Sequence, residues 1–377
     1  MVYLHSSCTS NPTFLSLLYS NKATNGFYSQ VPEHISSSIH LLLHLLSLTS
    51  LLLLQVLLLH LKLYFQRKFV WKVVLITVAS SGIGRGNMPC HLKNRFGHLA
   101  YEYARRGACL ALIARRENSL REVSDRAQEY GSPNVLMIHA DVSRLEECKR
   151  IVDETMSHFR RLDYLVNNVG IASMCKFEDA TDISDFRTVM YITHFAVPQL
   201  RESRGKIIVL ASSSWLPKPR MSFYNASGAA MVSFFETLRV EVGPEIKITI
   251  VTPGFIESEM TQGKFLLKEG KMEVDQDLRD VEVSTIPVGK VGGCAKAIVN
   301  SACRGERYLT EPAWFRVTYY WKVFFPEVIE WSYRLMYINK PGTSHKEALS
   351  KKILDVTGAK TILYPSTIQN PENIKND

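Results

Sequence analysis

Short apolar runs alternate with longer mixed segments through the middle of the chain. Six runs rich in Val, Ile and Leu are predicted as strands: Val73–Thr77, Ala108–Ala114, Val135–His139, Tyr164–Val166, Lys206–Ala211 and Lys247–Thr252. Each run is apolar along its length rather than at every second position, which is typical of strands covered on both faces. The segments between them are long enough for crossover helices. The pattern predicts a single α/β domain with a doubly wound parallel sheet.

A different pattern occupies the N-terminal part of the chain. The 23 residues from Leu41 to Leu63 include 15 leucines and one charge, Lys62. As a helix this stretch would be about 34 Å long, enough to cross a bilayer core of about 30 Å. A cleaved signal peptide is disfavoured because the run is too long, and a buried core helix because it is apolar all round. We expect a polar leader at residues 1–34 and a membrane anchor with a basic flank at residues 35–72.

Composition and charge exclude several classes of protein. Hydrophobic residues make up 46% of the 377 residues, which excludes a disordered or collagen-like chain. The seven cysteines are scattered without a C-x-x-C pair, so we expect neither a disulfide scaffold nor a metal site. Of the net charge of +9, residues 1–72 carry +4 and residues 85–97 carry +3, which leaves +2 for the rest. Nucleic-acid binding is therefore not indicated. The basic flank after the anchor places the folded domain on the cytoplasmic side.

Polar residues and glycines follow the predicted strands in a regular order. Carboxyl ends of parallel strands meet at one edge of a sheet, where ligands bind, and a glycine-rich turn there is a natural phosphate site. In chain order these segments are TVASSGIG (Thr77 to Gly84), Arg115-Arg116, Asp141-Val142, Asn167 to Gly170, Ser212 to Ser214, Tyr224 to Gly228, and Pro253-Gly254.

This ordered set resembles the short-chain dehydrogenase/reductase family, with its Rossmann-type fold, over residues 73–310. Segments such as HLAYEYARRGACLALIARRE and ITIVTPGFIESEMTQGKF are similar to the plant 11-beta-hydroxysteroid dehydrogenase-like group, which includes the steroleosins. The resemblance implies an NADP(H)-dependent oxidoreductase acting on the hydroxyl or ketone of a steroid, sterol or similar lipid. It also implies anchoring at the endoplasmic reticulum or a lipid droplet, and it is compatible with a homodimer.

The resemblance assigns cofactor-binding roles to residues at the strand ends. Arg115 and Arg116 would meet a 2′-phosphate, since guanidinium groups suit that anion, and Asp141 would bond the adenine amine. Solvated arginines at a helix start and an ordinary turn aspartate are the alternatives. The other implied cofactor contacts are Ser80, Ser81, Gly82, Ile83, Gly84, Val142, Asn168, Val169, Tyr224, Pro253 and Gly254.

The same resemblance places the reaction at Tyr224 and Ser213. Tyr224 would be the acid/base that passes a proton to or from the substrate oxygen. Ser213 would hold that oxygen by a hydrogen bond, and Ser212 or Ser214 could replace it if the local register differs. A tyrosine packed in the core is the alternative reading of Tyr224.

Four departures from the family pattern fall on the parts that the chemistry needs. Val78 replaces the first glycine of the turn, and residues 85–97 form an insertion that is either helical or a bulging loop. The segment Phe186–Arg204 is short and lacks the asparagine of the family's proton relay. Gly228 stands where the family has a lysine, one helical turn after Tyr224. Compensation by Lys218 or Arg220 is one open alternative; a catalytically dead scaffold at a membrane or lipid droplet, or a misjoined exon, is another.

The C-terminal part gives weaker signals. Residues 254–280 are expected to cover the substrate. Trp314 to Tyr337 contain ten aromatic residues in 24 positions and, within a C-terminal extension at 311–377, predict either an amphipathic element at a membrane or pocket, or simple packing on the sheet. From Asn339 onward we expect a polar tail with little core of its own.

Overall fold

The computed structural model describes residues 50, 55, 69–77, 95–168, 185–258, 260–266, 272–339 and 343–369. The chain divides into two compact units, Met1–Phe65 and Gln66–Asp377, and almost all described residues belong to the second. The predicted anchor, the glycine turn after the first strand and most of the insertion at 85–97 lie outside the described residues. Within the described ranges, no helix has the length and apolarity that a membrane crossing requires.

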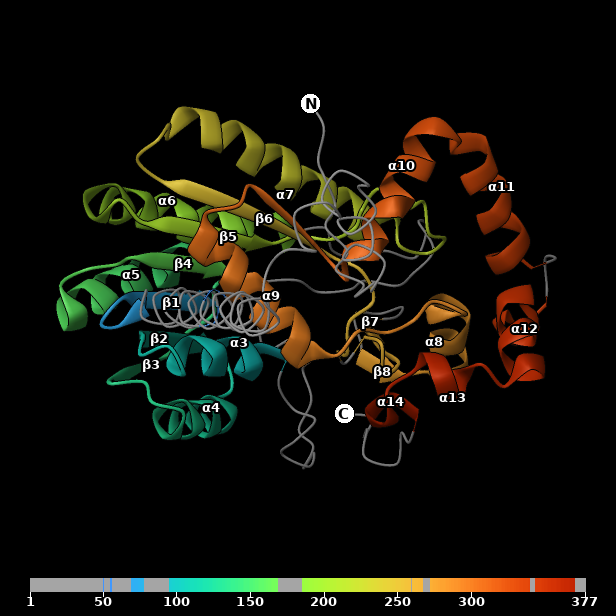
Figure 1. Ribbon diagram of the computed structural model, residues 1–377, viewed down its shortest axis with the longest axis horizontal. Helices are drawn as coiled ribbons and strands as arrows, with labels where there is room; N and C mark the ends of the chain where they lie inside the picture. The colour runs from blue at the N-terminus through green and yellow to red at the C-terminus, as the bar shows by residue number, and fades with distance from the viewer. Residues whose placement is uncertain are drawn as a thin grey trace, which may run out of the picture. The chain divides into compact units, whose positions relative to one another are not determined.

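A seven-stranded parallel sheet forms the centre of the second unit (Figure 1). Its order is β3-β2-β1-β4-β5-β6-β9. The strands are β1 (Val73–Thr77), β2 (Cys109–Ala114), β3 (Val135–His139), β4 (Tyr164–Asn167), β5 (Lys206–Leu210), β6 (Lys247–Pro253) and β9 (Tyr308–Glu311). All six predicted strands are confirmed to within one residue at each end. The short edge strand β9 was not predicted, because its sequence, YLTE, is not an apolar run.

Helices cover both faces of the sheet, as the continuous apolar runs predict. Val74 and Ile76 of β1 belong to one core, and Val73 and Leu75 to another on the opposite face. The first core is closed by α3 (Arg95–Ala104), α4 (Glu117–Glu129) and α9 (Val291–Arg304), and the second by α5 (Leu145–Phe159), α6 (Asp185–Ser203) and α7 (Ser222–Glu241). This is the predicted doubly wound α/β fold.

The strand order reverses between β1 and β4. From β1 the chain continues outward through β2 and β3, and then returns to pair β4 with the other side of β1. Two neighbouring parallel strands whose connections leave in opposite directions open a crevice beyond their carboxyl ends. The fold therefore places the ends of β1, β4 and β5 where a ligand binds in such sheets.

The residues after β6 form smaller elements beside this edge. They are β7 (Lys264–Leu266), β8 (Met272–Val274), α8 (Gln276–Val283), η5 (Ala313–Arg316), α10 (Val317–Phe324), α11 (Pro326–Tyr337), η6 (His345–Glu347), α12 (Leu349–Thr357), α13 (Lys360–Leu363) and α14 (Ser366–Gln369). Residues 343–369, expected to belong to a polar tail with little core of its own, pack on the domain. Leu354, Tyr364 and Ile368 are buried in a cluster with Val283 and Val288.

Candidate functional site

Thr77 and two asparagines join β1 to β4 at the crevice. The Thr77 hydroxyl donates to the Val166 carbonyl at 3.2 Å and accepts from the Asn168 backbone N–H at 3.0 Å. Asn167 Nδ2 donates to Thr193 Oγ1 of α6 at 2.8 Å, which holds this asparagine in place. The Asn168 side chain is also buried, but its Nδ2 has no hydrogen-bond partner within the part of the chain that the structure describes. A polar ligand bound at this edge would satisfy this donor.

Arg115, Arg116 and Asp141 lie at the ends of β2 and β3, as predicted. Arg115 is exposed, whereas Arg116 is half-buried and precedes the first residue of α4. Asp141 Oδ1 accepts hydrogen bonds from the backbone N–H and the hydroxyl of Ser143, at 3.0 and 2.8 Å. Burial raises the pKa of Asp141, but these bonds and the charges of Arg115 and Arg144 outweigh it, so the pKa is lowered. Asp141 is thus an ionised turn residue close to a guanidinium group.

Tyr224 lies in the first turn of α7, beside the loop that follows β5. Its ring is half-buried and packs on the cluster of Met221, Phe265 and Leu278. Asn225 Nδ2 donates to the Leu216 carbonyl at 2.8 Å and so joins α7 to the serine-bearing loop. This packing agrees partly with the alternative of a core tyrosine, but Tyr224 is not fully buried.

Gly228 is buried, and its Cα faces the serines. A Cβ built at Gly228 would lie 2.0 Å from Ser214 Oγ and 3.1 Å from Ser212 Cβ. Real Cβ atoms do not approach other atoms so closely, so the Ser214 side chain takes up space that any larger residue at 228 would need. The predicted substrate contact, Ser213, accepts a hydrogen bond from Leu216 N at its carbonyl, at 3.3 Å. The described contacts therefore bring Ser212 and Ser214, rather than Ser213, against Gly228.

Lys218 and Arg220 are engaged with α8. Lys218 Nζ donates to the Glu282 carbonyl, and its side chain is buried against Glu282 and over the Phe255 ring, 4.4 Å from the centroid. Burial lowers the pKa of Lys218, although the charge of Glu282 opposes this shift. Arg220 contacts the same carboxylate at 3.3 Å. Both cations are thus held on Glu282, an arrangement that gives no support to the idea that either replaces the missing lysine.

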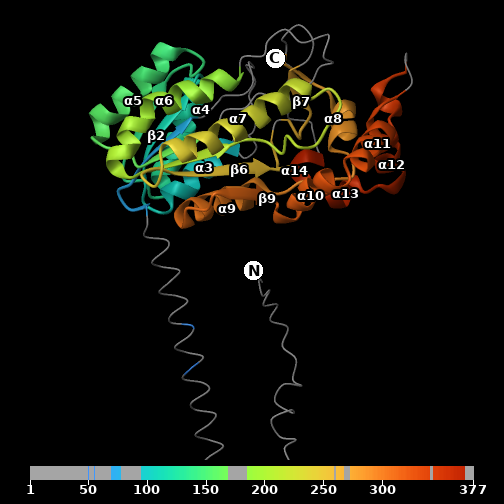
Figure 2. The same cartoon turned by 90° about the horizontal axis from the view of Figure 1, so that it is seen from above.

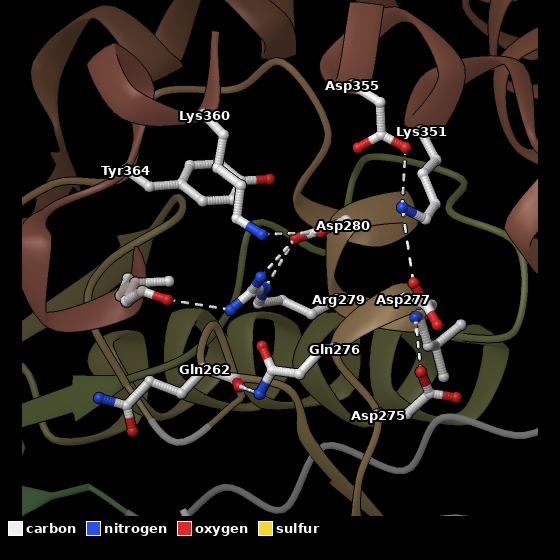
Figure 3. Close-up of polar contacts among 12 residues, drawn as sticks. Gln262, Asp275, Gln276, Asp277, Arg279, Asp280, Lys351, Asp355, Lys360 and Tyr364 are labelled. Atoms are coloured by element: carbon white, nitrogen blue, oxygen red, sulfur yellow. Dashed lines mark hydrogen bonds and ion pairs between the residues drawn. The ribbon is translucent and has the colours of Figure 1, made fainter. Parts of the chain in front are cut away.

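A buried ion network fixes α8 to the C-terminal helices (Figure 3). Arg279 is fully buried; its Nε and Nη2 donate to Asp280 Oδ1 at 2.8 and 2.6 Å, and its Nη1 donates to the Ile368 carbonyl at 3.0 Å. Lys360 Nζ donates to the other oxygen of Asp280 at 2.9 Å. The Tyr364 hydroxyl donates to the Ser284 carbonyl at 2.9 Å. The end of the segment predicted to cover the substrate, residues 254–280, is therefore held in place by hydrogen bonds and ion pairs with residues near the C-terminus.

Gly254 and Trp215 connect the site to the aromatic segment after β9. The Gly254 N–H donates to the Glu311 carbonyl at 2.9 Å, and a Cβ at Gly254 would lie 2.7 Å from the Phe315 ring. Trp215 Nε1 donates to Thr318 Oγ1 of α10 at 2.9 Å. The sequence reasoning missed Trp215, Glu282 and Thr193, and only Trp215, a large aromatic residue directly after the serines, carried a signal that could have marked it.

Comparison with known families identifies the fold and its relatives. The sequence model of the family described as short chain dehydrogenase matches residues 72–266, more than half of the chain. The chain belongs to the short-chain dehydrogenase family. The 11-beta-hydroxysteroid dehydrogenase A of Sesamum indicum is 58% identical over 322 residues, covering 83% of this chain and 88% of that protein. The 11-beta-hydroxysteroid dehydrogenase 1A of Arabidopsis thaliana is 53% identical over the same length and coverage.

Solved structures share the fold of this short-chain dehydrogenase. Carveol dehydrogenase from Mycobacterium avium in complex with NAD has a TM-score of 0.52 at 19% identity, covering 65% of this chain and 97% of that one. A short-chain dehydrogenase/reductase from Serratia marcescens also has a TM-score of 0.52, at 22% identity, covering 64% of this chain and 96% of that one. At these identities the likeness shows the fold alone.

The residues beyond β2, β3 and β4 suit the binding of a nicotinamide cofactor. The residues around Tyr224 differ from those that the family resemblance implies. Among the described residues the buried Asn168 amide has no hydrogen-bond partner, and Arg115 and Asp141 lie beyond β2 and β3 at the carboxyl edge, where dinucleotides bind in sheets of this kind. Near Tyr224, Gly228 brings no charge, and Ser214 occupies the space beside it. Polar groups suited to a nucleotide therefore lie beyond β2, β3 and β4, whereas position 228 lacks the lysine charge that the family resemblance implies.

Proposed function

We propose that this short-chain dehydrogenase is a membrane-anchored, NADP(H)-dependent oxidoreductase that interconverts a hydroxyl and a ketone on a steroid, sterol or similar lipid. The observation that carries the proposal is the position of Tyr224. It lies partly exposed in the first turn of α7, one helical turn before Gly228, which faces Ser212 and Ser214 of the loop after β5. Relatives named 11-beta-hydroxysteroid dehydrogenase, at 53–58% identity over most of the chain, support the substrate class.

Each residue of the site has a definite part in this proposal. A bound nicotinamide supplies or accepts the hydride. Tyr224 gives a proton to the ketone oxygen in reduction and takes it back in oxidation, while a serine hydroxyl, at 213 or a neighbouring position, holds that oxygen. Arg115 and Arg116 bind the 2′-phosphate that distinguishes NADP from NAD, and Asn168 satisfies its amide on the cofactor. Gly228 leaves Tyr224 without the family's cation, so we expect proton transfer to limit the rate.

The membrane part of the proposal rests on the sequence of residues 41–63. Fifteen leucines in 23 positions suit an apolar span, and the absence of proline between Pro32 and Pro89 favours a bilayer span over the proline-bearing hairpin of the steroleosin-like anchors. The basic flank that follows favours a cytoplasmic position of the enzyme domain, at the endoplasmic reticulum or a lipid droplet.

Deuterium transfer tests the proposed reaction. The full chain, reconstituted in phosphatidylcholine vesicles, is incubated with NADPH carrying deuterium at the transferable position and with a panel of ketosteroids. We expect a hydroxysteroid with deuterium on the carbinol carbon, and we expect the Tyr224→Phe variant to form none while still binding NADPH. Deuterium transfer that persists undiminished in Tyr224→Phe would contradict the role of Tyr224.

Gly228 favours a second candidate function, a scaffold of the same fold without turnover. Ser214 Oγ occupies the position that the Cβ of a lysine at 228 would take, and Lys218 and Arg220 are held by Glu282. The same deuterium assay separates the two candidates. If the chain binds NADPH but forms no product with any ketosteroid, the scaffold is favoured.

A further inference from the structure

Exposed apolar side chains gather on the segment from η5 through α11. We call residues 313–338 the aromatic hairpin. Among the described residues, 22 large hydrophobic side chains are exposed, and 12 of them lie between Trp314 and Ile338. Elsewhere such residues occur singly or in pairs, which is normal for a protein surface. The twelve are Trp314, Val317, Tyr319, Tyr320, Trp321, Val323, Phe324, Phe325, Val328, Trp331, Leu335 and Ile338. This concentration needs a physical reason.

Helix α10 is apolar around most of its exposed surface. Successive residues turn by about 100°, so the exposed residues between Val317 and Phe324 cover more than half of its circumference. The remaining sector holds Thr318 and Lys322, and Thr318 faces the domain through its bond from Trp215. α10 has no buried residue. A helix that is apolar around so much of its exposed circumference suits a fluid apolar phase, because a single protein partner contacts one face.

Helix α11 has the pattern of a helix lying in a membrane interface. Val328, Trp331 and Leu335 form one exposed apolar stripe, at spacings of three and four residues. The charged residues Glu327, Glu330 and Arg334 lie along one side of this stripe, and Tyr333 and Tyr337 pack inward on Val281 of α8. An apolar stripe bordered by charges allows a helix to enter the headgroup boundary with its charges still in water.

The chemistry of the aromatic hairpin favours a phospholipid surface without net charge. Trp and Tyr concentrate where one end of a side chain is apolar and the other is hydrated, as at the headgroup level of a bilayer. Arg316, Lys322 and Arg334 are nearly balanced by Glu327 and Glu330, so the surface carries a net charge of +1. Such a surface has no strong attraction for an anionic partner and gains mainly by burying its apolar side chains.

We propose that the aromatic hairpin docks on a phospholipid bilayer, as a membrane contact separate from residues 41–63. α10 and α11 lie at one end of the domain, away from α5 and β3 at the other (Figure 1, Figure 2). Trp215 and Gly254, in the loops after β5 and β6, contact the hairpin through Thr318 and Phe315. Docking therefore brings these two loops of the carboxyl edge close to the lipid phase, where an apolar substrate is dissolved.

Photocrosslinking in the full chain tests the docking. The photoreactive amino acid p-benzoylphenylalanine replaces Phe324, which is 69% exposed, or Trp331, which is 65% exposed, in separate proteins. Val240, 81% exposed at the end of α7, is the matched control position. The proteins are mixed with phosphatidylcholine vesicles that contain an alkyne-tagged phosphatidylcholine, and tagged lipid on the protein is measured after irradiation. We expect adducts at 324 and 331 to exceed those at 240 severalfold.

A charge placed on the hairpin provides the second variant. Phe324→Glu exposes a charge where lipid contact is proposed, and it should lower lipid adducts at position 331 about tenfold, whereas Val240→Glu should leave them unchanged. Both changes lie on exposed side chains, and the unfolding midpoint checks that the fold is kept. Equal adduct yields at 324, 331 and 240 would overturn the proposal, as would crosslinks from 324 to a second copy of the chain. The comparison does not depend on turnover, so it can fail while the proposed reaction stands.

Discussion

The two sides of the carboxyl edge differ in whether their polar groups are paired within the protein. Beyond β2, β3 and β4, the Asn168 amide has no partner among the residues that the structure describes, and hydrogen bonds from Ser143 keep Asp141 ionised near Arg115. Beyond β5 and β6, charged groups are already matched with one another: Lys218 and Arg220 with Glu282, and Arg279 and Lys360 with Asp280. We refer to these as the nucleotide side and the reaction side.

This difference teaches that the order of a family's residues along the chain does not establish its chemistry. The reaction side has a tyrosine and three serines in family order, yet its cations stabilise the fold instead of serving Tyr224. A nearby ammonium group favours an ionised phenol, and one pKa unit corresponds to about 1.4 kcal/mol. Our central claim is that the absence of a cation at position 228 limits proton transfer by Tyr224.

The largest expected effect is on stability, at the ion network of the reaction side. Asp280→Ala removes the partner of Arg279, which is fully buried, and should lower the free energy of unfolding by about 3–5 kcal/mol. Asp355→Ala is the control, since Asp355 is exposed and its partner Lys351 keeps Asp277 as a second partner, so this change should cost less than about 1 kcal/mol. Urea unfolding of both variants measures the difference. Similar losses of unfolding free energy in Asp280→Ala and Asp355→Ala would contradict the stabilising role of the buried network.

A smaller effect is expected on the nucleotide side. Replacing Arg115 and Arg116 together by alanine should raise the dissociation constant for NADPH at least about 10- to 100-fold, because the loss of even one charge-assisted hydrogen bond costs about 1.5–3 kcal/mol. Binding of NADH should change little. Arg121→Ala removes another exposed arginine of α4 and serves as the control. Equal weakening of NADPH and NADH binding in the double variant would contradict recognition of the 2′-phosphate.

The contact between Gly228 and Ser214 should show in stability on the reaction side. Gly228→Ala gains about 1 kcal/mol of helix propensity, but it places a Cβ against Ser214 Oγ and should destabilise the protein by about 1–2 kcal/mol in total. In a Ser214→Gly background the clash is largely removed, and the same change should be neutral or stabilising. Thermal or urea unfolding of the four proteins forms a double-mutant cycle. Additive effects would rule out the contact.

The smallest effect concerns Asp163, just before β4, at the edge of the sheet opposite the two sides. Burial raises the pKa of Asp163, but hydrogen bonds from Arg161, Lys72 and the Val73 N–H outweigh it, so the folded-state pKa is lowered. The stability it contributes is present above the unfolded pKa of about 4 and is lost as the pH falls through the lower folded value. Asp163→Asn should therefore lower the free energy of unfolding by about 1 kcal/mol at pH 7. At a pH below the folded-state pKa of Asp163 the same change should lower it by almost nothing. A cost that stays constant with pH would contradict the assignment.

Much of the fold could be predicted because its signals are local. Continuous apolar runs such as Val73–Thr77 mark strands buried on both faces, whereas the partly exposed β9 gives no such signal. The C-terminal segment was misjudged because its burial depends on distant polar partners. Charged residues such as Arg279 and Asp280 are usually exposed. Here the fold buries them, with hydrogen bonds from Arg279 to the Ile368 carbonyl and from Lys360 to Asp280.

The candidate site was predictable in outline and not in detail. The order of the motifs located Tyr224, Asp141 and Asn168 at one edge of the sheet, because parallel strands place their carboxyl ends together. The partner of Lys218 could not be predicted, since Glu282 lies 64 residues further along the chain. The contact of Gly228 with Ser214 likewise depends on how the loop after β5 packs on α7.

Restoring the cation tests the central claim most directly. The measurement is the turnover number of the full-chain variant Ser214→Gly with Gly228→Lys, in which the first change makes room for the second, relative to the unchanged chain, with NADPH and a ketosteroid. We predict an increase of about tenfold or more, since general acid catalysis contributes about 100- to 10,000-fold when its group is correctly placed, and no increase when Tyr224→Phe is added. An unchanged turnover number in a variant that folds and binds NADPH would contradict the claim.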